Sequence, residues 1–186
     1  MVFSFTGTAN LFPKQILLGF CFMVAFQTSG QELSGQDLLK KTIEYHDANN
    51  NWDTFNGKLF IEMKAPNGSD RLSEVVIDLP NQYFKLSALK NNTKVEHIVD
   101  KNISSFTLNG NSTFTEEEAK TYNLTETRAK FMKNYYTFLY GLPMKLKDSG
   151  TIINPAVERK EFMGKEYLVL KVKYEEGVGK FLVLLF

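Results

Sequence analysis

The chain has 186 residues, a length that suits one domain with its own hydrophobic core. Its 22 basic and 21 acidic residues nearly cancel and form no long basic patch, which argues against nucleic acid as a partner. Cys21 is the only cysteine, so the sequence excludes an internal disulfide.

Residues 1–30 are predicted to be a secretory signal peptide. Lys14 precedes an apolar run of eleven residues, 16–26, which is shorter than the about 20 residues that a membrane span needs. Small and polar residues follow, so we expect cleavage near Gly30 and a single domain over residues 31–186, either periplasmic or secreted. Lipidation at Cys21 is not expected, because the large Phe20 precedes it and the apolar run continues beyond it.

The first part of the domain predicts one helix and then a meander of strands. Ser34 and Asp37 can cap a helix that ends at Asp47. The hydrophobic period then changes from 3.6 to 2, and tight-turn sequences separate five short strands. These strands are expected near residues 58–64, 74–79, 84–88, 95–99 and 103–108. Since no helix lies between them, they predict an antiparallel meander.

A helical insert is expected after the meander. Thr115 and Glu118 form a capping box for a short helix ending near Tyr122. A longer helix begins after Thr125 and stops at Gly141, with Pro143 two residues later. Its apolar residues span roughly 200° of the helix surface, more than the ~100° of a surface helix, so we expect the sheet to cover it. The arc contains Phe131, Met132, Tyr135, Tyr136, Phe138, Leu139 and Tyr140, with Tyr135 near its centre and Tyr136 near its edge.

The last part of the chain predicts a hairpin and an unusual end. Residues 157–162 and 167–174 form the hairpin strands, and Met163-Gly164 forms the turn. Residues 180–186 are mostly apolar without alternation. Either this segment is paired and buried on both sides, or the chain stops before its natural end; we favour truncation, because such a strand left on a sheet edge promotes aggregation.

Three segments carry a family resemblance: Tyr45-His46-Asp47 with Trp52, residues 134–146, and residues 164–172. With the order of elements, they resemble an uncharacterised family of Gram-negative envelope proteins in the superfamily of the outer-membrane lipoprotein carriers LolA and LolB. The likeness covers about residues 33–178. It implies an α+β fold, in which an incomplete half-barrel of curved antiparallel sheet encloses an apolar cavity beneath a helical lid. Proteins of this family sometimes carry the name deoxyribose-phosphate aldolase, which a meander cannot support because that enzyme is a (β/α)₈ barrel of about 250 residues.

Most of the chemically suggestive residues have an ordinary structural explanation. His46 beside Asp47 is a candidate base or metal ligand, but it lies on the apolar stripe of its helix, so we expect a packed histidine. His97 is expected to share a face with Val95 and Val99. We predict no metal, no cofactor and no catalytic residues, and therefore a protein that is not an enzyme.

The long helix carries the candidate ligand-binding residues. Arg128 lies within its apolar arc, where a guanidinium needs a carboxylate, a ligand anion or a route to solvent. The aromatic residues either pack in the core or line a cavity, and buried tyrosines need hydrogen-bond partners. The candidate ligand-binding residues are Arg128, Phe131, Tyr135, Tyr136, Phe138 and Tyr140.

Two functions remain open on this evidence. The first is a periplasmic or secreted binding protein that holds a lipid, an acylated protein or another apolar small molecule between sheet and lid, with Arg128 offered to an anionic head group. The second is an envelope interaction protein whose concave sheet docks a protein partner. Peripheral contact with the envelope membrane is compatible with either function.

Overall fold

The computed structural model describes residues 32–66, 68–177 and 182–185. The fold is α+β, as predicted: it has a five-stranded antiparallel sheet, a second sheet, an N-terminal helix and a helix on the first sheet. Within these residues neither sheet closes into a barrel. The predicted signal peptide lies outside the described residues.

The N-terminal helix α2 (Gly35–His46) begins at the predicted cap. Ser34 Oγ accepts a hydrogen bond from the backbone N–H of Asp37 at 3.1 Å and donates one to the Asp37 carboxylate at 2.6 Å. After the helix, the Asp47 carboxylate accepts hydrogen bonds from the backbone N–H groups of Asn51 and Trp52. These bonds fix the loop that leads into the short 3₁₀-helix η2 (Trp52–Thr54).

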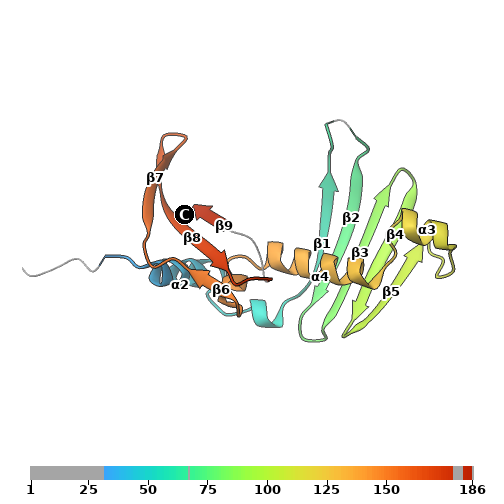
Figure 1. Ribbon diagram of the computed structural model, residues 1–186, viewed down its shortest axis with the longest axis horizontal. Coiled ribbons are helices and arrows are strands. Elements are labelled where there is room, and N and C mark those ends of the chain that lie inside the picture. Colours follow the sequence, from blue (N-terminus) through green and yellow to red (C-terminus); the bar gives the residue numbers. More distant parts are fainter. Residues whose placement is uncertain (1–31, 67, 178–181, 186) are drawn as a thin grey trace, which may run out of the picture. The chain divides into compact units, whose positions relative to one another are not determined.

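The predicted meander is confirmed. Strands β1 (Asn56–Met63), β2 (Arg71–Asp78), β3 (Tyr83–Lys90), β4 (Thr93–Asp100) and β5 (Ile103–Leu108) lie side by side in chain order (Figure 1). Asn91 and Asn92 join β3 to β4 with positive φ angles of 50° and 61°, which asparagine tolerates better than most residues. Strands β1 and β5 are the two edges of this sheet.

The register sorts the side chains of this sheet onto two faces, because successive side chains in a strand alternate. We call one the helix face; one row across it is Leu59, Val75, Leu86, His97 and Phe106. We call the opposite one the outer face; one row across it is Phe60, Glu74, Ser87, Glu96 and Thr107.

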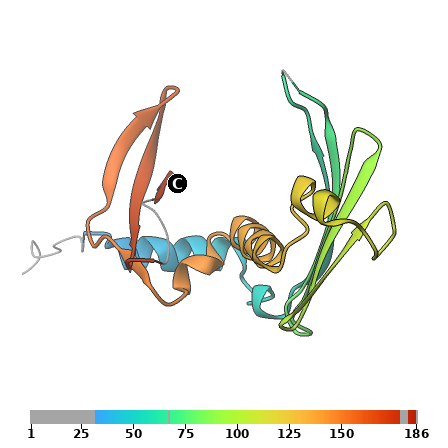
Figure 2. The same cartoon turned by 45° about the vertical axis from the view of Figure 1, so that its right-hand side comes forward.

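Two further helices follow β5, and both begin at their predicted caps. Helix α3 (Glu116–Thr121) has the complete capping box of Thr115 and Glu118. Helix α4 (Glu126–Tyr140) is capped by Thr125, whose Oγ1 accepts a hydrogen bond from the backbone N–H of Arg128 at 3.2 Å, and it ends at Gly141. Figure 2 shows α4 beside one face of the five-stranded sheet.

The main hydrophobic core lies between α4 and the helix face. Helix α4 buries Ala129, Met132 and Tyr136 against a cluster of sheet residues: Val75, Ile77, Phe84, Leu86 and Val99. The prediction that the sheet covers the whole apolar arc is wrong, because the sheet buries only one stripe of the helix. Four large residues of the arc are exposed: Phe131, Tyr135, Leu139 and Tyr140.

After α4 come the 3₁₀-helix η3 (Met144–Lys147) and the second sheet. Strand β8 (Lys165–Tyr174) pairs antiparallel with β6 (Thr151–Ile153), β7 (Glu158–Phe162) and β9 (Leu182–Leu185). The β7–β8 hairpin is confirmed, whereas β6 was not predicted. Residues 182–185 of the predicted terminal segment form strand β9 and pair with β8, whereas residues 180, 181 and 186 lie outside the described residues.

Candidate functional site

The six predicted ligand-binding residues all lie on α4, but their side chains have different environments. Tyr136 is buried against the sheet, and Arg128 is half-buried in the first turn. Phe138 contacts Tyr174 of β8, with ring centroids 6.4 Å apart. The remaining three, Phe131, Tyr135 and Tyr140, are exposed. The helix thus brings only part of the predicted set together at its surface.

Tyr136 is the aromatic centre of the contact between α4 and the sheet. Its side chain is 4% exposed and stacks on Phe84, with ring centroids 6.3 Å apart. On the helix it also touches Tyr135 edge-on at 5.2 Å and stacks on Tyr140 at 6.2 Å. The buried stripe therefore runs through Tyr136, at the edge of the predicted apolar arc, and not through Tyr135 near its centre.

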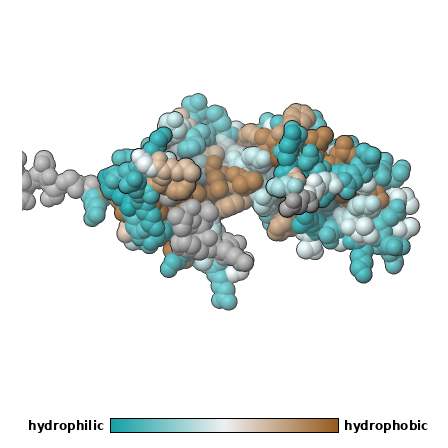
Figure 3. Space-filling view, turned by 90° about the horizontal axis from the view of Figure 1, so that it is seen from above, coloured by the Kyte–Doolittle hydropathy of each residue, from teal (hydrophilic) through white to brown (hydrophobic). Residues whose placement is uncertain are grey.

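Next to this contact, α4 presents an exposed row of large apolar side chains. Phe131, Tyr135 and Leu139 follow at intervals of four residues, so they lie on one line along the helix. Phe131 is 54% exposed and Tyr135 49% exposed, and their rings stack with centroids 6.2 Å apart. Figure 3 shows exposed hydrophobic residues, in brown, among hydrophilic ones on one face of the molecule. We call these three residues the α4 row.

Arg128 extends the α4 row at its N-terminal end. Its guanidinium carbon lies 5.3 Å from the centre of the Phe131 ring, a cation–π contact. Among the described residues it forms no ion pair with a carboxylate. The described residues therefore do not provide the carboxylate partner that was one of the predicted alternatives for Arg128. A ligand anion and contact with solvent are the other two.

A second arginine, which the sequence analysis missed, reaches the same region from the sheet. Arg71 lies at the start of β2 on the helix face, and its Nη2 donates a hydrogen bond to the Tyr136 hydroxyl at 3.3 Å. Its Nε is buried without a hydrogen-bond partner within the described part of the chain. Arg71, Ser73 and Val75 alternate along β2, so the sequence pattern could have placed Arg71 on the helix face. It was missed because the predicted strand began only at Glu74.

The two faces of the five-stranded sheet differ in charge. All acidic residues of these strands lie on the outer face: Glu62, Glu74, Asp78, Glu96 and Asp100. The helix face carries the cationic side chains of Arg71 and Lys90. A group that approaches α4 along the helix face therefore meets positive charge, which favours an anion.

Burial changes the pKa values of two groups on this face. His97 is 5% exposed, and burial together with the nearby Arg128 guanidinium lowers its pKa from 6.5 to about 4. Its Nδ1 is buried and has no hydrogen-bond partner within the described residues. Burial also raises the pKa of the Tyr136 hydroxyl, against the opposing effect of Arg71. Both groups are therefore neutral near pH 7.

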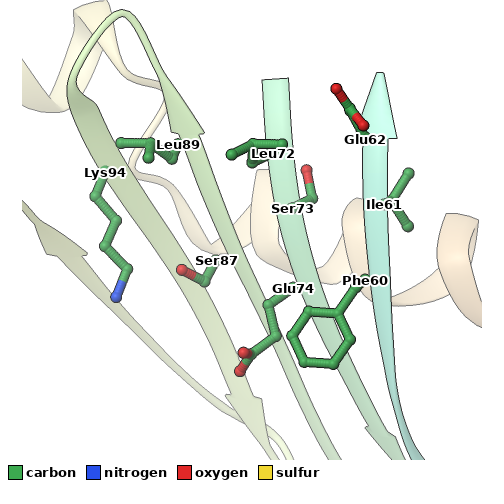
Figure 4. A pocket seen from close by; sticks show the side chains of 9 residues that line it. All are labelled: Phe60, Ile61, Glu62, Leu72, Ser73, Glu74, Ser87, Leu89 and Lys94. Atoms are coloured by element: carbon green, nitrogen blue, oxygen red, sulfur yellow. The ribbon is translucent and has the colours of Figure 1, made fainter. Parts of the chain in front are cut away.

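The outer face carries a separate, shallow groove of about 420 Å³ (Figure 4). It is lined by Phe60, Ile61, Glu62, Leu72, Ser73, Glu74, Ser87, Leu89 and Lys94. Leu72 and Leu89 are direct cross-strand neighbours in its apolar part. Close by, burial alone would raise the pKa of Glu96, but the hydroxyl of Thr107 and the ammonium groups of Lys85 and Lys94 hold it at about 2.

The other sequence candidates lie apart from this region. His46 is exposed, so the expectation of a packed histidine is wrong; its Nδ1 bonds the carbonyl oxygen of Thr42 in its own helix at 2.9 Å. His97 does share a face with Val95 and Val99, as predicted. Within residues 32–66, 68–177 and 182–185 no group of three or more His, Cys, Asp or Glu is placed to hold a metal. In the same ranges no helix is long and apolar enough to cross a membrane.

Comparison with known proteins places the chain in a family. The model of a family of unknown function, DUF6503, matches residues 14–183, so the chain belongs to this family. No curated protein and no solved structure matches the chain.

Proposed function

We propose that this member of the DUF6503 family is a non-catalytic binding protein for an amphipathic ligand with an anionic group, either a lipid or an acylated protein. The apolar part of the ligand lies along the α4 row, and its anionic group lies near Arg128 and Arg71. Helix α4 acts as the lid on the sheet. No covalent step is involved.

One observation carries this proposal: an exposed aromatic pair adjoins a guanidinium that has no carboxylate partner in the described residues. Phe131 and Tyr135 stack on one another, and Arg128 lies over Phe131. An apolar chain laid on this row gains about 0.8 kcal/mol for each methylene group removed from water. A guanidinium beside it can bind a carboxylate or phosphate with two parallel hydrogen bonds.

The contact between α4 and the sheet is filled with side chains, which limits where the ligand can lie. Ala129, Met132 and Tyr136 pack directly on Val75 and Phe84 and their neighbours. We therefore place the ligand beside this contact, on the side where Arg71 reaches the Tyr136 hydroxyl. The ligand then lies where α4 and the sheet meet, but outside the packed centre of their contact.

The same proposal includes the location of the protein. The apolar segment after Lys14 supports export to the periplasm or to the outside of the cell. The resemblance to the LolA and LolB half-barrels supports a role in handling lipids or acylated proteins of the envelope. Both points rest on sequence pattern and analogy.

The direct experiment is titration of the purified protein with a fluorescent fatty-acid analogue. Tyr135→Ala removes half of the stacked pair, so its dissociation constant should rise about five- to ten-fold. Tyr45→Ala is the matched control, because Tyr45 is also an exposed tyrosine but lies on α2. Absence of binding by the wild type, or an equal loss in both variants, would contradict the proposal.

A second experiment needs no chosen ligand. Native mass spectrometry of protein purified from the periplasm should reveal an added mass of a lipid. If the protein carries no such mass and also binds no fatty-acid analogue, the alternative of a protein that docks a polypeptide partner gains support instead.

A further inference from the structure

Strand β1 is a long and regular edge strand of the five-stranded sheet. It runs for eight residues, Asn56–Met63, and pairs with β2 at every position without a bulge. In the described part of the chain no strand pairs with its other side. The strand contains no proline. Long regular edges offer unpaired backbone N–H and C=O groups to another strand, so native proteins usually cover or interrupt them.

The outer-face side chains of β1 combine an exposed aromatic ring with two charges. Phe60 is 77% exposed on the outer face, beside the groove with Leu72 and Leu89 (Figure 4). Lys58 and Glu62 lie two residues before and after it on the same face. Lys58 pairs with Glu74 at 3.1 Å, and Glu62 pairs with Lys64 at 3.3 Å, so both charges remain at the surface.

The outer-face order Lys58, Phe60, Glu62 is complementary to the same three residues running in the opposite direction. If β1 pairs antiparallel with a second β1 about a two-fold axis at Phe60, Phe60 meets its own copy. Each Lys58 then faces a Glu62 of the other copy, on both sides of the axis. On the helix face, Leu59 meets Ile61. Opposite charges and aromatic pairs at facing positions both stabilise antiparallel strands.

The neighbouring two-fold registers lack this complementarity. An axis at Leu59 places Lys58 opposite Phe60 and leaves Glu62 opposite Asn56. An axis at Ile61 places Lys58 opposite Lys64, two like charges, and Phe60 opposite Glu62. Facing residues must share a face, so a two-fold axis between residues is excluded. The axis at Phe60 is therefore favoured.

We propose that this protein forms a two-fold symmetric homodimer in which β1 pairs antiparallel with β1 of a second copy, centred on Phe60. The pairing joins two five-stranded sheets into one continuous sheet and covers both exposed edges. A closed two-fold interface of this kind uses the same patch twice and leaves no free edge at β1 for further addition. The proposal does not depend on ligand binding at α4.

Charge reversal with rescue tests the proposed register. In sedimentation velocity experiments, Lys58→Glu and Glu62→Lys should each raise the dimer dissociation constant about ten-fold, because each turns two facing pairs from attraction to repulsion. The double variant Lys58→Glu/Glu62→Lys should restore dimerisation. A wild type that stays monomeric up to the highest soluble concentration would overturn the proposal, as would a double variant that is no better than the single ones.

Cysteine cross-linking gives an independent measurement. In a Cys21→Ser background, Phe60→Cys should form a disulfide-linked dimer on mild oxidation, because position 60 faces its own copy. Glu62→Cys is the control: its two copies lie four residues apart along the strands, about 13 Å, beyond the reach of a disulfide. Cross-linking of Glu62→Cys without that of Phe60→Cys would contradict the register.

Discussion

Tyr135 and Tyr136 are neighbours in sequence with opposite environments, so they test how α4 packs. Tyr136 is buried and stacks on Phe84, whereas Tyr135 is half-exposed. Tyr136→Ala removes a buried aromatic ring and should lower the free energy of unfolding by about 3–5 kcal/mol. Tyr135→Ala removes a ring that already contacts water and should cost about 1 kcal/mol.

The assay is equilibrium unfolding in urea, followed by circular dichroism and by the fluorescence of Trp52, the only tryptophan. Equal slopes against denaturant are required before the two free energies are compared. Tyr136→Phe keeps the ring but removes the hydroxyl that accepts from Arg71, and should cost about 0.5–1.5 kcal/mol. If Tyr135→Ala destabilises the protein as much as Tyr136→Ala, the assigned buried stripe is wrong.

Three further predictions concern stability. Gly35→Ala should lower the melting temperature despite the better helix propensity of alanine, because its Cβ would lie 2.0 Å from the Asn154 carbonyl oxygen. Burial and Arg128 lower the pKa of His97 from 6.5 to about 4, so the unfolded chain takes up this proton first as pH falls. The free energy of unfolding should therefore decline between pH 6.5 and 4, by up to about 3 kcal/mol before solvent screening reduces this value. The measurement is urea unfolding at each pH, in which His97→Gln should show a smaller decline. Thr125→Ala removes the cap of α4 and should cost about 1 kcal/mol in the same assay at pH 7.

Features set by local sequence were predicted well. The caps at Thr115 and Thr125 and the stop at Gly141 depend on a few adjacent residues, and all three are present. The alternation of side chains predicted the strands of the meander. It also predicted that His97 shares a face with Val95 and Val99, because a strand has only two faces.

The direction in which α4 faces could not be predicted in the same way. A helical wheel shows which residues share a side, but an apolar arc of roughly 200° does not say which part of it meets the sheet. Ala129, at 0% exposure, is small and adds little to the apolar pattern, yet it marks the buried stripe because it lets the helix approach the sheet closely. The contact of Arg71 with Tyr136 joins residues 65 apart in sequence and depends on that approach.

The most direct test of the proposed function compares two ligands that differ only in charge. A long-chain fatty acid and the corresponding alcohol are titrated into the wild type and into Arg71→Gln/Arg128→Gln, with Arg159→Gln as a control because Arg159 is an exposed arginine on β7. The wild type and the control should bind the acid at least about ten-fold more tightly than the alcohol. The double variant should bind both ligands with similar affinity. Equal binding of acid and alcohol by the wild type, or an undiminished preference for the acid in the double variant, would contradict an anionic head-group site at these two arginines.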